Sequence, residues 1–124
     1  REDLWMVNEM GMSLRKQGDW QGAVNAYQRA LQNIPNEAGL HYNMGMAYLQ
    51  GKEHARAIAQ FEKAVAASPE ILQESPLIPF NIGMVYYQMK KFQDAERYMR
   101  CALDVDPEFE QALDVLRKIG SSNA

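Results

Sequence analysis

A triplicated pattern of glycine, alanine and proline restricts the fold of this chain more than any other sequence feature. Each copy begins with a glycine, followed after twelve residues by one alanine, after seven more by a second, and after five more by a proline. The three copies are Gly11, Ala23, Ala30 and Pro35; Gly45, Ala57, Ala64 and Pro69; and Gly83, Ala95, Ala102 and Pro107. A period of 34 to 38 residues is typical of stacked helical hairpins, which more often form a binding scaffold than an enzyme.

The positions of the helices follow from the same pattern. A glycine inside a helix costs about 1 kcal/mol relative to alanine, so three in register indicate that two helix backbones approach closely. Each proline follows an apolar segment and is suited to end a helix there. We predict helix A of the three copies over residues 4–17, 38–51 and 77–89, and helix B over residues 20–33, 54–67 and 92–105.

The spaced residues resemble the tetratricopeptide repeat (TPR) family. Its repeat carries an apolar residue and glycine on helix A, an aromatic residue one turn later, then alanine, an aromatic residue, alanine and a final proline. The second copy matches this pattern with Met44-Gly45, Tyr48, Ala57, Phe61, Ala64 and Pro69. The resemblance implies an all-α, right-handed superhelical solenoid of antiparallel helical hairpins with seven helices. It also implies a single domain over residues 1–119, with repeats at about 4–37, 38–71 and 76–109.

The C-terminal residues predict one more helix. Residues 108–119 carry an apolar stripe at helical spacing, with Asp106 as N-cap and Pro107 as the first helical residue. We interpret this helix as a cap over the third repeat, and a docking helix is the alternative. Residues 120–124 are predicted to form a mobile polar tail.

Four extra residues separate the second and third copies, within the segment 69–79. Because they equal about one helical turn, they either lengthen a helix or form a short turn before Pro76. Pro79 lies near the start of the third helix A, where proline is tolerated only in the first turn. We expect a local irregularity, which is either a tolerated loop insertion or a feature that widens the binding groove.

Composition argues against several classes of partner. The net charge is −3 and the basic residues are scattered without interleaved aromatic residues, so we expect no nucleic acid partner. No apolar segment approaches the ~20 residues of a membrane span. A single cysteine cannot form an internal disulfide, which favours a cytoplasmic location. The chain shows no signal peptide, but it begins at Arg1 rather than Met. Two alternatives therefore stay open: that it is a fragment of a longer protein, and that an export signal was removed and the protein is periplasmic.

The sequence contains no motif for catalysis or metal binding. Cys101 has no histidine or second cysteine at ligand spacing, and we expect it to be partly exposed on helix B. His41 and His54 occupy repeat positions that usually pack against other helices, and neither has acid–base partners nearby in the pattern. We therefore predict that the chain is not an enzyme and holds no cofactor or metal.

The inner face of the A helices is the candidate binding surface. In the TPR family this concave groove is lined by helix-A residues, and its ligands are usually peptide segments of other proteins. The resemblance assigns to the groove Trp5, Asn8, Met12 and Arg15 from the first copy; Tyr42, Asn43, Met46 and Leu49 from the second; and Leu77, Phe80, Asn81, Met84 and Tyr87 from the third.

Three methionines in this set each follow a repeat glycine. The residues before the glycines are assigned to the core, and adjacent residues on a helix do not share a face. We therefore expect Met12, Met46 and Met84 to form one solvent-accessible row, the alternative being that they point between helices. Methionine suits a binding surface because its side chain is flexible and polarizable. Asn43 and Asn81 either pair with a peptide main chain or are solvated locally.

One TPR subtype holds the acidic C-terminal tail of chaperones in a two-carboxylate clamp of lysine, asparagine and arginine residues. The matching positions here are Asn8, Met12, Asn43, Leu77 and Asn81, of which only Asn43 agrees. Because the cations are missing, we do not expect chaperone-tail binding.

Two functions are open. The leading hypothesis is a protein–protein interaction module that binds an apolar or amphipathic segment of a partner in the concave groove. The alternative is an assembly or oligomerisation element, or a regulatory repeat domain of a larger protein of the bacterial signalling type. In that case a neighbouring chain or domain fills the groove.

Overall fold

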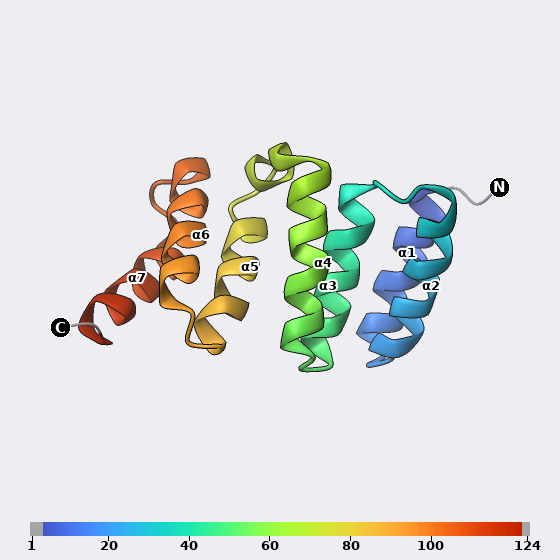
Figure 1. Cartoon of the computed structure of the whole chain (residues 1–124), viewed down its shortest axis with the longest axis horizontal. Coiled ribbons are helices and arrows are strands. Elements are labelled where there is room, and N and C mark those ends of the chain that lie inside the picture. Colours follow the sequence, from blue (N-terminus) through green and yellow to red (C-terminus); the bar gives the residue numbers. More distant parts are fainter. Residues whose placement is uncertain (1–3, 123–124) are drawn as a thin grey trace. The chain divides into compact units, whose positions relative to one another are not determined.

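The structure is a computed structural model that describes residues 4–122, and within them it contains seven α-helices and no β-strand. The helices (Figure 1) are α1 (Leu4–Lys16), α2 (Trp20–Asn33), α3 (Ala38–Gln50), α4 (His54–Ala67), α5 (Leu77–Gln88), α6 (Phe92–Val105) and α7 (Glu110–Ser122). The predicted all-α fold is confirmed, and the six repeat helices end within one residue of their predicted bounds. None of these helices has the length and apolar character needed to cross a membrane.

The chain forms two compact units, one ending at Pro69 and the other beginning at Glu70. In the first unit, α1 and α2 form one antiparallel hairpin and α3 and α4 form the next, with α2 packed against α3 (Figure 1). In the second unit, α5 and α6 form a hairpin and α7 packs against α6. The single domain expected over residues 1–119 stays a prediction.

Side chains of helix B occupy the space beside the repeat glycines. A Cβ on Gly11 would lie 2.2 Å from the Tyr27 ring, and one on Gly45 would lie 2.5 Å from the Phe61 ring. Tyr27 and Phe61 are almost fully buried. The glycines are therefore required by the close approach of α1 to α2 and of α3 to α4.

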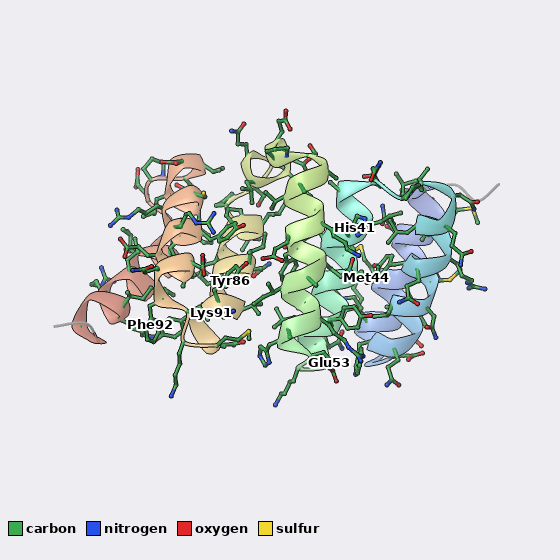
Figure 2. The ribbon with its side chains drawn as sticks, viewed as in Figure 1. His41, Met44, Glu53, Tyr86, Lys91 and Phe92 are labelled. Carbon is green, nitrogen blue, oxygen red and sulfur yellow. The ribbon has the colours of Figure 1, made fainter. Side chains whose placement is uncertain are left out.

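The turns between the helices of each hairpin share one backbone geometry. In each, the amide N–H of the residue before helix B donates to a carbonyl five residues earlier, as Lys91 does to Tyr86 at 2.9 Å. Glu53 and Lys91 mark this position at the α3–α4 and α5–α6 turns (Figure 2). The preceding residue has a positive φ in all three turns: Gly18 at 84°, Lys52 at 60° and Lys90 at 63°.

The segment that holds the four extra residues contains a short 3-10 helix, η1 (Pro69–Gln73), and does not extend a neighbouring α-helix. Pro79 lies in the first turn of α5, as expected, and is fully buried. Whether the insertion widens a groove stays a matter of prediction.

The prediction for the C-terminal helix was wrong at both ends. Asp106 Oδ1 accepts a hydrogen bond from the Glu108 amide at 3.1 Å, which stabilises a turn, so α7 begins at Glu110 instead of Pro107. The helix continues through Gly120 to Ser122, where a tail was expected. The last two residues of that predicted tail lie outside the described residues. Packing of the apolar stripe, with Ala112 and Ile119 buried, accounts for the continuation despite the glycine.

One core assignment was also wrong. Met44 and Ile82 are buried as predicted, but Met10 is 43% exposed. Met44 lies beside α2, which packs on α3, whereas the described residues include no helix before α1 that could cover Met10. The same repeat position is therefore core only where a preceding hairpin covers it.

Candidate functional site

The predicted groove residues of the first unit lie at its surface. Trp5 is 66% exposed and Met12 is 43% exposed. The other members of the set are half-buried: Asn8, Arg15, Tyr42, Asn43, Met46 and Leu49. Met46, at the position after Gly45, is thus not enclosed between helices, unlike Met44 at the position before it.

Two amides on this surface pair with each other across α1 and α3. Asn43 Nδ2 donates to Asn8 Oδ1 at 3.1 Å. Tyr42, next to Asn43, contacts the Phe61 ring, with centroids 5.5 Å apart. Asn8 and Asn43 therefore form a polar link between helices in this structure, and Tyr42 contributes partly to the core.

Arg15 is turned partly toward the α1–α2 contact. Its Nε and the Tyr27 hydroxyl are buried, and within residues 4–122 neither atom has a hydrogen-bond partner. Burial raises the pKa of the Tyr27 phenol, and the nearby Arg15 guanidinium partly offsets that rise. Part of the Arg15 side chain is consequently unavailable to a ligand on the predicted surface.

The second unit carries its own share of the predicted residues. Leu77 is 48% exposed, while Phe80, Asn81, Met84 and Tyr87 are half-buried. Phe80 packs edge-on against Phe109 with centroids 5.5 Å apart, and Tyr87 packs against Phe92 at 5.6 Å. These aromatic residues therefore also hold α5 to the elements beside it.

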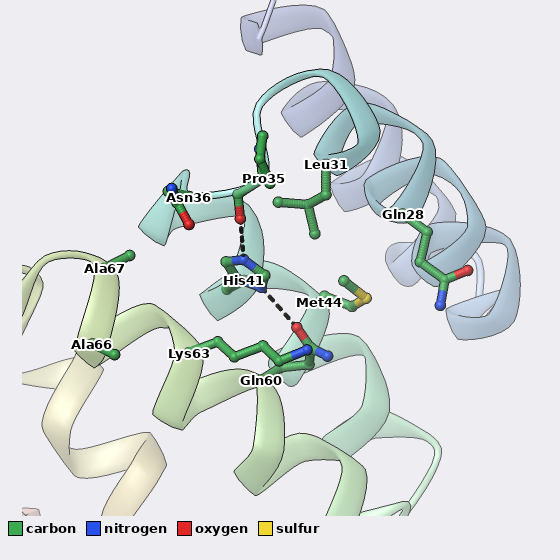
Figure 3. A pocket seen from close by; sticks show the side chains of 10 residues that line it. All are labelled: Gln28, Leu31, Pro35, Asn36, His41, Met44, Gln60, Lys63, Ala66 and Ala67. Carbon is green, nitrogen blue, oxygen red and sulfur yellow. Dashed lines mark hydrogen bonds between the residues drawn. The ribbon is translucent and has the colours of Figure 1, made fainter.

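One cleft of the first unit was not predicted from the sequence. It has a volume of about 830 Å³ and lies between α2 and α4 over α3 (Figure 3). Its lining residues are Gln28, Leu31, Pro35, Asn36, His41, Met44, Gln60, Lys63, Ala66 and Ala67. A second cleft of about 370 Å³ shares Gln28 with it and is lined by Trp20, Gln21, Val24, Asn25, Tyr48 and Arg56.

Helical spacing explains why these side chains meet. Gln21, Asn25 and Gln28 lie four and three residues apart and so share one face of α2. Arg56, Gln60 and Lys63 repeat that spacing on α4. The two stripes could have been recognised in the sequence, but only the packing of α2 and α4 on α3 brings them together.

His41 lies at the floor of the larger cleft, projecting from α3 with Met44 (Figure 2). It is buried, and its ring nitrogens face two oxygen atoms at 2.8 Å, Nε2 the carbonyl oxygen of Pro35 and Nδ1 the side-chain Oε1 of Gln60 (Figure 3). Because both ring nitrogens are engaged by structural partners, His41 acts as a packing residue that joins the α2–α3 loop to α4. The same contact fixes the Gln60 side chain in the cleft wall.

The described residues show no grouping suited to metal binding. No cluster of three or more histidine, cysteine, aspartate or glutamate side chains within residues 4–122 could hold an ion. Cys101 is half-buried on α6, and burial together with nearby Asp104 raises the pKa of its thiol. A raised pKa lowers the thiolate fraction and hence the reactivity of this cysteine at neutral pH.

Comparisons with known proteins match the arrangement of helices. A family model described as "Tetratricopeptide repeat" matches residues 8–70, and a second with the same description matches residues 80–109. Tetratricopeptide repeat protein 16 from Homo sapiens is 28% identical over 114 residues, covering 90% of this chain and 13% of that protein. Photosystem I assembly protein Ycf3 from Synechococcus sp. (strain CC9605) is 28% identical over 117 residues, covering 92% of this chain and 64% of that protein.

The chain thus spans less than two thirds of the length of these relatives. Among solved structures, the first TPR domain of Spaghetti (RPAP3) bound to the HSP90 peptide SRMEEVD superposes with a TM-score of 0.84 at 24% identity. That alignment covers 95% of this chain and 90% of the other, and it shows a shared fold. Because the first family model alone covers half of the sequence, the chain belongs to the tetratricopeptide repeat family.

Proposed function

We propose that the chain is a protein–protein interaction module that binds an apolar or amphipathic segment of a partner on the A-helix surface of its first unit. The observation that carries the proposal is the exposure of apolar side chains beside paired amides. Met12 is 43% exposed and Met46 is half-buried, while Asn8 and Asn43 lie between α1 and α3. Burying a methionine side chain contributes about 1.5–3 kcal/mol, enough for a few such residues to anchor a segment.

The second unit supports this proposal independently. Met84 occupies the same repeat position as Met46 and is likewise half-buried, and Leu77 is 48% exposed. The predicted single row through all three methionines remains part of the proposal. No chemistry on the ligand is required.

The proposed ligand differs from the peptide held by the similar solved TPR domain, which is bound to the HSP90 peptide SRMEEVD. Met12 and Leu77 stand at positions where the chaperone-tail clamp carries polar or cationic residues, and both are exposed. An acidic tail would therefore lose its charge-assisted hydrogen bonds here. We propose that this surface selects apolar rather than acidic segments.

Self-assembly is the second candidate, and the exposed apolar residues of α1 favour it. Trp5, Met6 and Met10 are all more than two-fifths exposed. Such a patch is a usual feature of an interface between protein chains. Sedimentation across a concentration series distinguishes the two candidates, since only assembly predicts a mass that rises with concentration.

Peptides selected on the wild-type chain from a random phage-displayed library provide the test. We expect apolar consensus residues, and we expect Met46→Glu and Met12→Glu to abolish binding because each places a charge in the apolar contact. Met6→Glu is the matched control, since Met6 is exposed on another face of α1. Retention of the selected peptides by both groove variants would show that the ligand binds elsewhere. A loss of self-association in the Met6 variant alone would favour assembly.

A further inference from the structure

The two clefts that share Gln28 lie along the same pair of helices, α2 and α4. We call them together the α2–α4 groove. Its floor is formed by His41, Met44 and Tyr48, which recur at helical spacing on α3. These three residues lie on the side of α3 that packs against α2 and α4. Met46 is two residues from both Met44 and Tyr48 and so projects from another side of the helix. The groove is therefore separate from the surface that carries Met12 and Met46.

The charges of the α2–α4 groove are of one sign. Arg56 lines one cleft and Lys63 the other, seven residues apart on α4, and neither cleft is lined by an aspartate or glutamate. Within the described residues, no hydrogen bond or salt bridge engages the side chains of Arg56 or Lys63. The chain as a whole has a net charge of −3, so a groove with two available cations departs from the average surface.

The opposite wall is made of amides. Gln21, Asn25 and Gln28 on α2 line the groove, and within residues 4–122 their side chains make no hydrogen bond. Gln60 faces them from α4, held in place by its contact with His41 at 2.8 Å. An amide both donates and accepts, so such a wall can pair with the N–H and C=O groups of an extended main chain.

We infer that the α2–α4 groove is a binding site for an acidic, extended polypeptide segment of a partner protein. The amides would pair with the main chain of the segment, and Arg56 and Lys63 would bind its carboxylates. The more accessible apolar side chains of the lining, Leu31, Ala66 and Ala67, would contact its apolar atoms. This inference goes beyond the proposed function, since it concerns a different face of the first unit and a ligand of opposite character.

The spacing of the two cations sets the spacing of the acidic residues. Seven residues along a helix span about 10 Å. An extended chain advances about 3.3 Å per residue, so the two cations lie about three residues apart along it. Carboxylates two to four positions apart, on flexible side chains, would therefore reach Arg56 and Lys63 together.

A polypeptide fits this groove better than a nucleic acid. Two cations neutralise few phosphates, and the rest of a chain with net charge −3 would repel a polyanion. The aromatic side chains at one end, Trp20 and Tyr48, contact each other with ring centroids 6.2 Å apart. They are partly occupied by this contact and do not present a row of stacking platforms for bases.

The test uses the whole chain and two pools of terminally blocked peptides of about eight residues. One pool carries two aspartate or glutamate residues two to four positions apart, and the other carries asparagine or glutamine instead. We expect the acidic pool, at up to about 1 mM, to shift the NMR signals of the Gln28 and Gln60 side-chain amides and of the His41 ring. The Arg56→Glu, Lys63→Glu double variant should bind the acidic pool about tenfold more weakly or worse.

Two control variants test whether binding depends on the groove cations themselves. The Lys16→Glu, Arg29→Glu double variant changes the net charge equally at exposed positions outside the groove and should bind normally. Met46→Glu should also bind the acidic pool normally, even if the proposed apolar surface fails. The inference is overturned if the neutral pool binds as well as the acidic pool, or if the NMR shifts fall on the surface around Met46 instead of the groove. It is also overturned if neither peptide pool shifts the groove signals, or if only a short single-stranded RNA shifts them.

Discussion

At the scale of single residues, the repeat glycines are required because another side chain occupies the position of their missing Cβ. At Gly45 the ring of Phe61, itself buried, would lie 2.5 Å from an added Cβ. We expect Gly45→Ala to force α3 and α4 apart and to lower the free energy of unfolding by about 1–3 kcal/mol. Chemical denaturation, followed by circular dichroism, measures this change.

Gly120→Ala is the matched control for that experiment. Gly120 is helical and exposed, and within residues 4–122 no atom outside its own turn of the helix lies within 4 Å of an added Cβ. The same substitution should therefore stabilise α7 by up to about 1 kcal/mol, because alanine has the higher helix propensity. Equal effects of the two substitutions would mean that helix propensity, and not close packing, decides the role of these glycines.

At the scale of the elements, the three hairpin turns provide an internal comparison. Each places one residue at a positive φ, but only the first turn has a glycine there, Gly18 at 84°. Lys90 adopts 63° at the equivalent position, a conformation that costs a non-glycine residue about 1–2 kcal/mol. We expect Lys90→Gly to raise the stability of the chain by about 0.5–1 kcal/mol after the entropic cost of glycine.

Lys91→Gly tests the specificity of that gain. Lys91 is adjacent but has a negative φ of −93°, so glycine there relieves no strain and should destabilise the chain. Thermal melts of both variants against the wild type give the comparison. A melting temperature of the Lys90→Gly variant lower than that of the wild type would indicate that the positive φ of Lys90 does not destabilise the chain.

At the scale of the whole molecule, the two compact units suggest that stability is local. In repeat architectures each repeat is stabilised by itself and by its neighbours. Ala57 on α4 and Ala95 on α6 are both fully buried at the same repeat position. We expect Ala57→Leu to increase amide hydrogen exchange mainly in α3 and α4, and Ala95→Leu mainly in α5 and α6, because each overpacks one hairpin. Uniform acceleration by both variants would instead show a single cooperative unit.

The helices themselves could be predicted from the sequence because their signals are local. The glycine and alanine spacing, and the prolines that end each repeat, placed six helices within one residue of their observed bounds. The C-terminal helix was less well predicted, since the Asp106 turn and the packing that continues α7 past Gly120 depend on contacts outside the local pattern.

The exposure and the lining of the surfaces depend on which helices lie side by side, and this could not be predicted from the sequence. The pattern alone determined the fold and the family. It assigned Met10 to the core because it could not indicate that no described helix covers that residue. It also missed the α2–α4 groove, because Gln28 and Lys63 become neighbours only when α2 and α4 both pack on α3. Helical periodicity determines which residues share a face, whereas exposure and ligand chemistry depend on the neighbouring helix, which only tertiary packing determines.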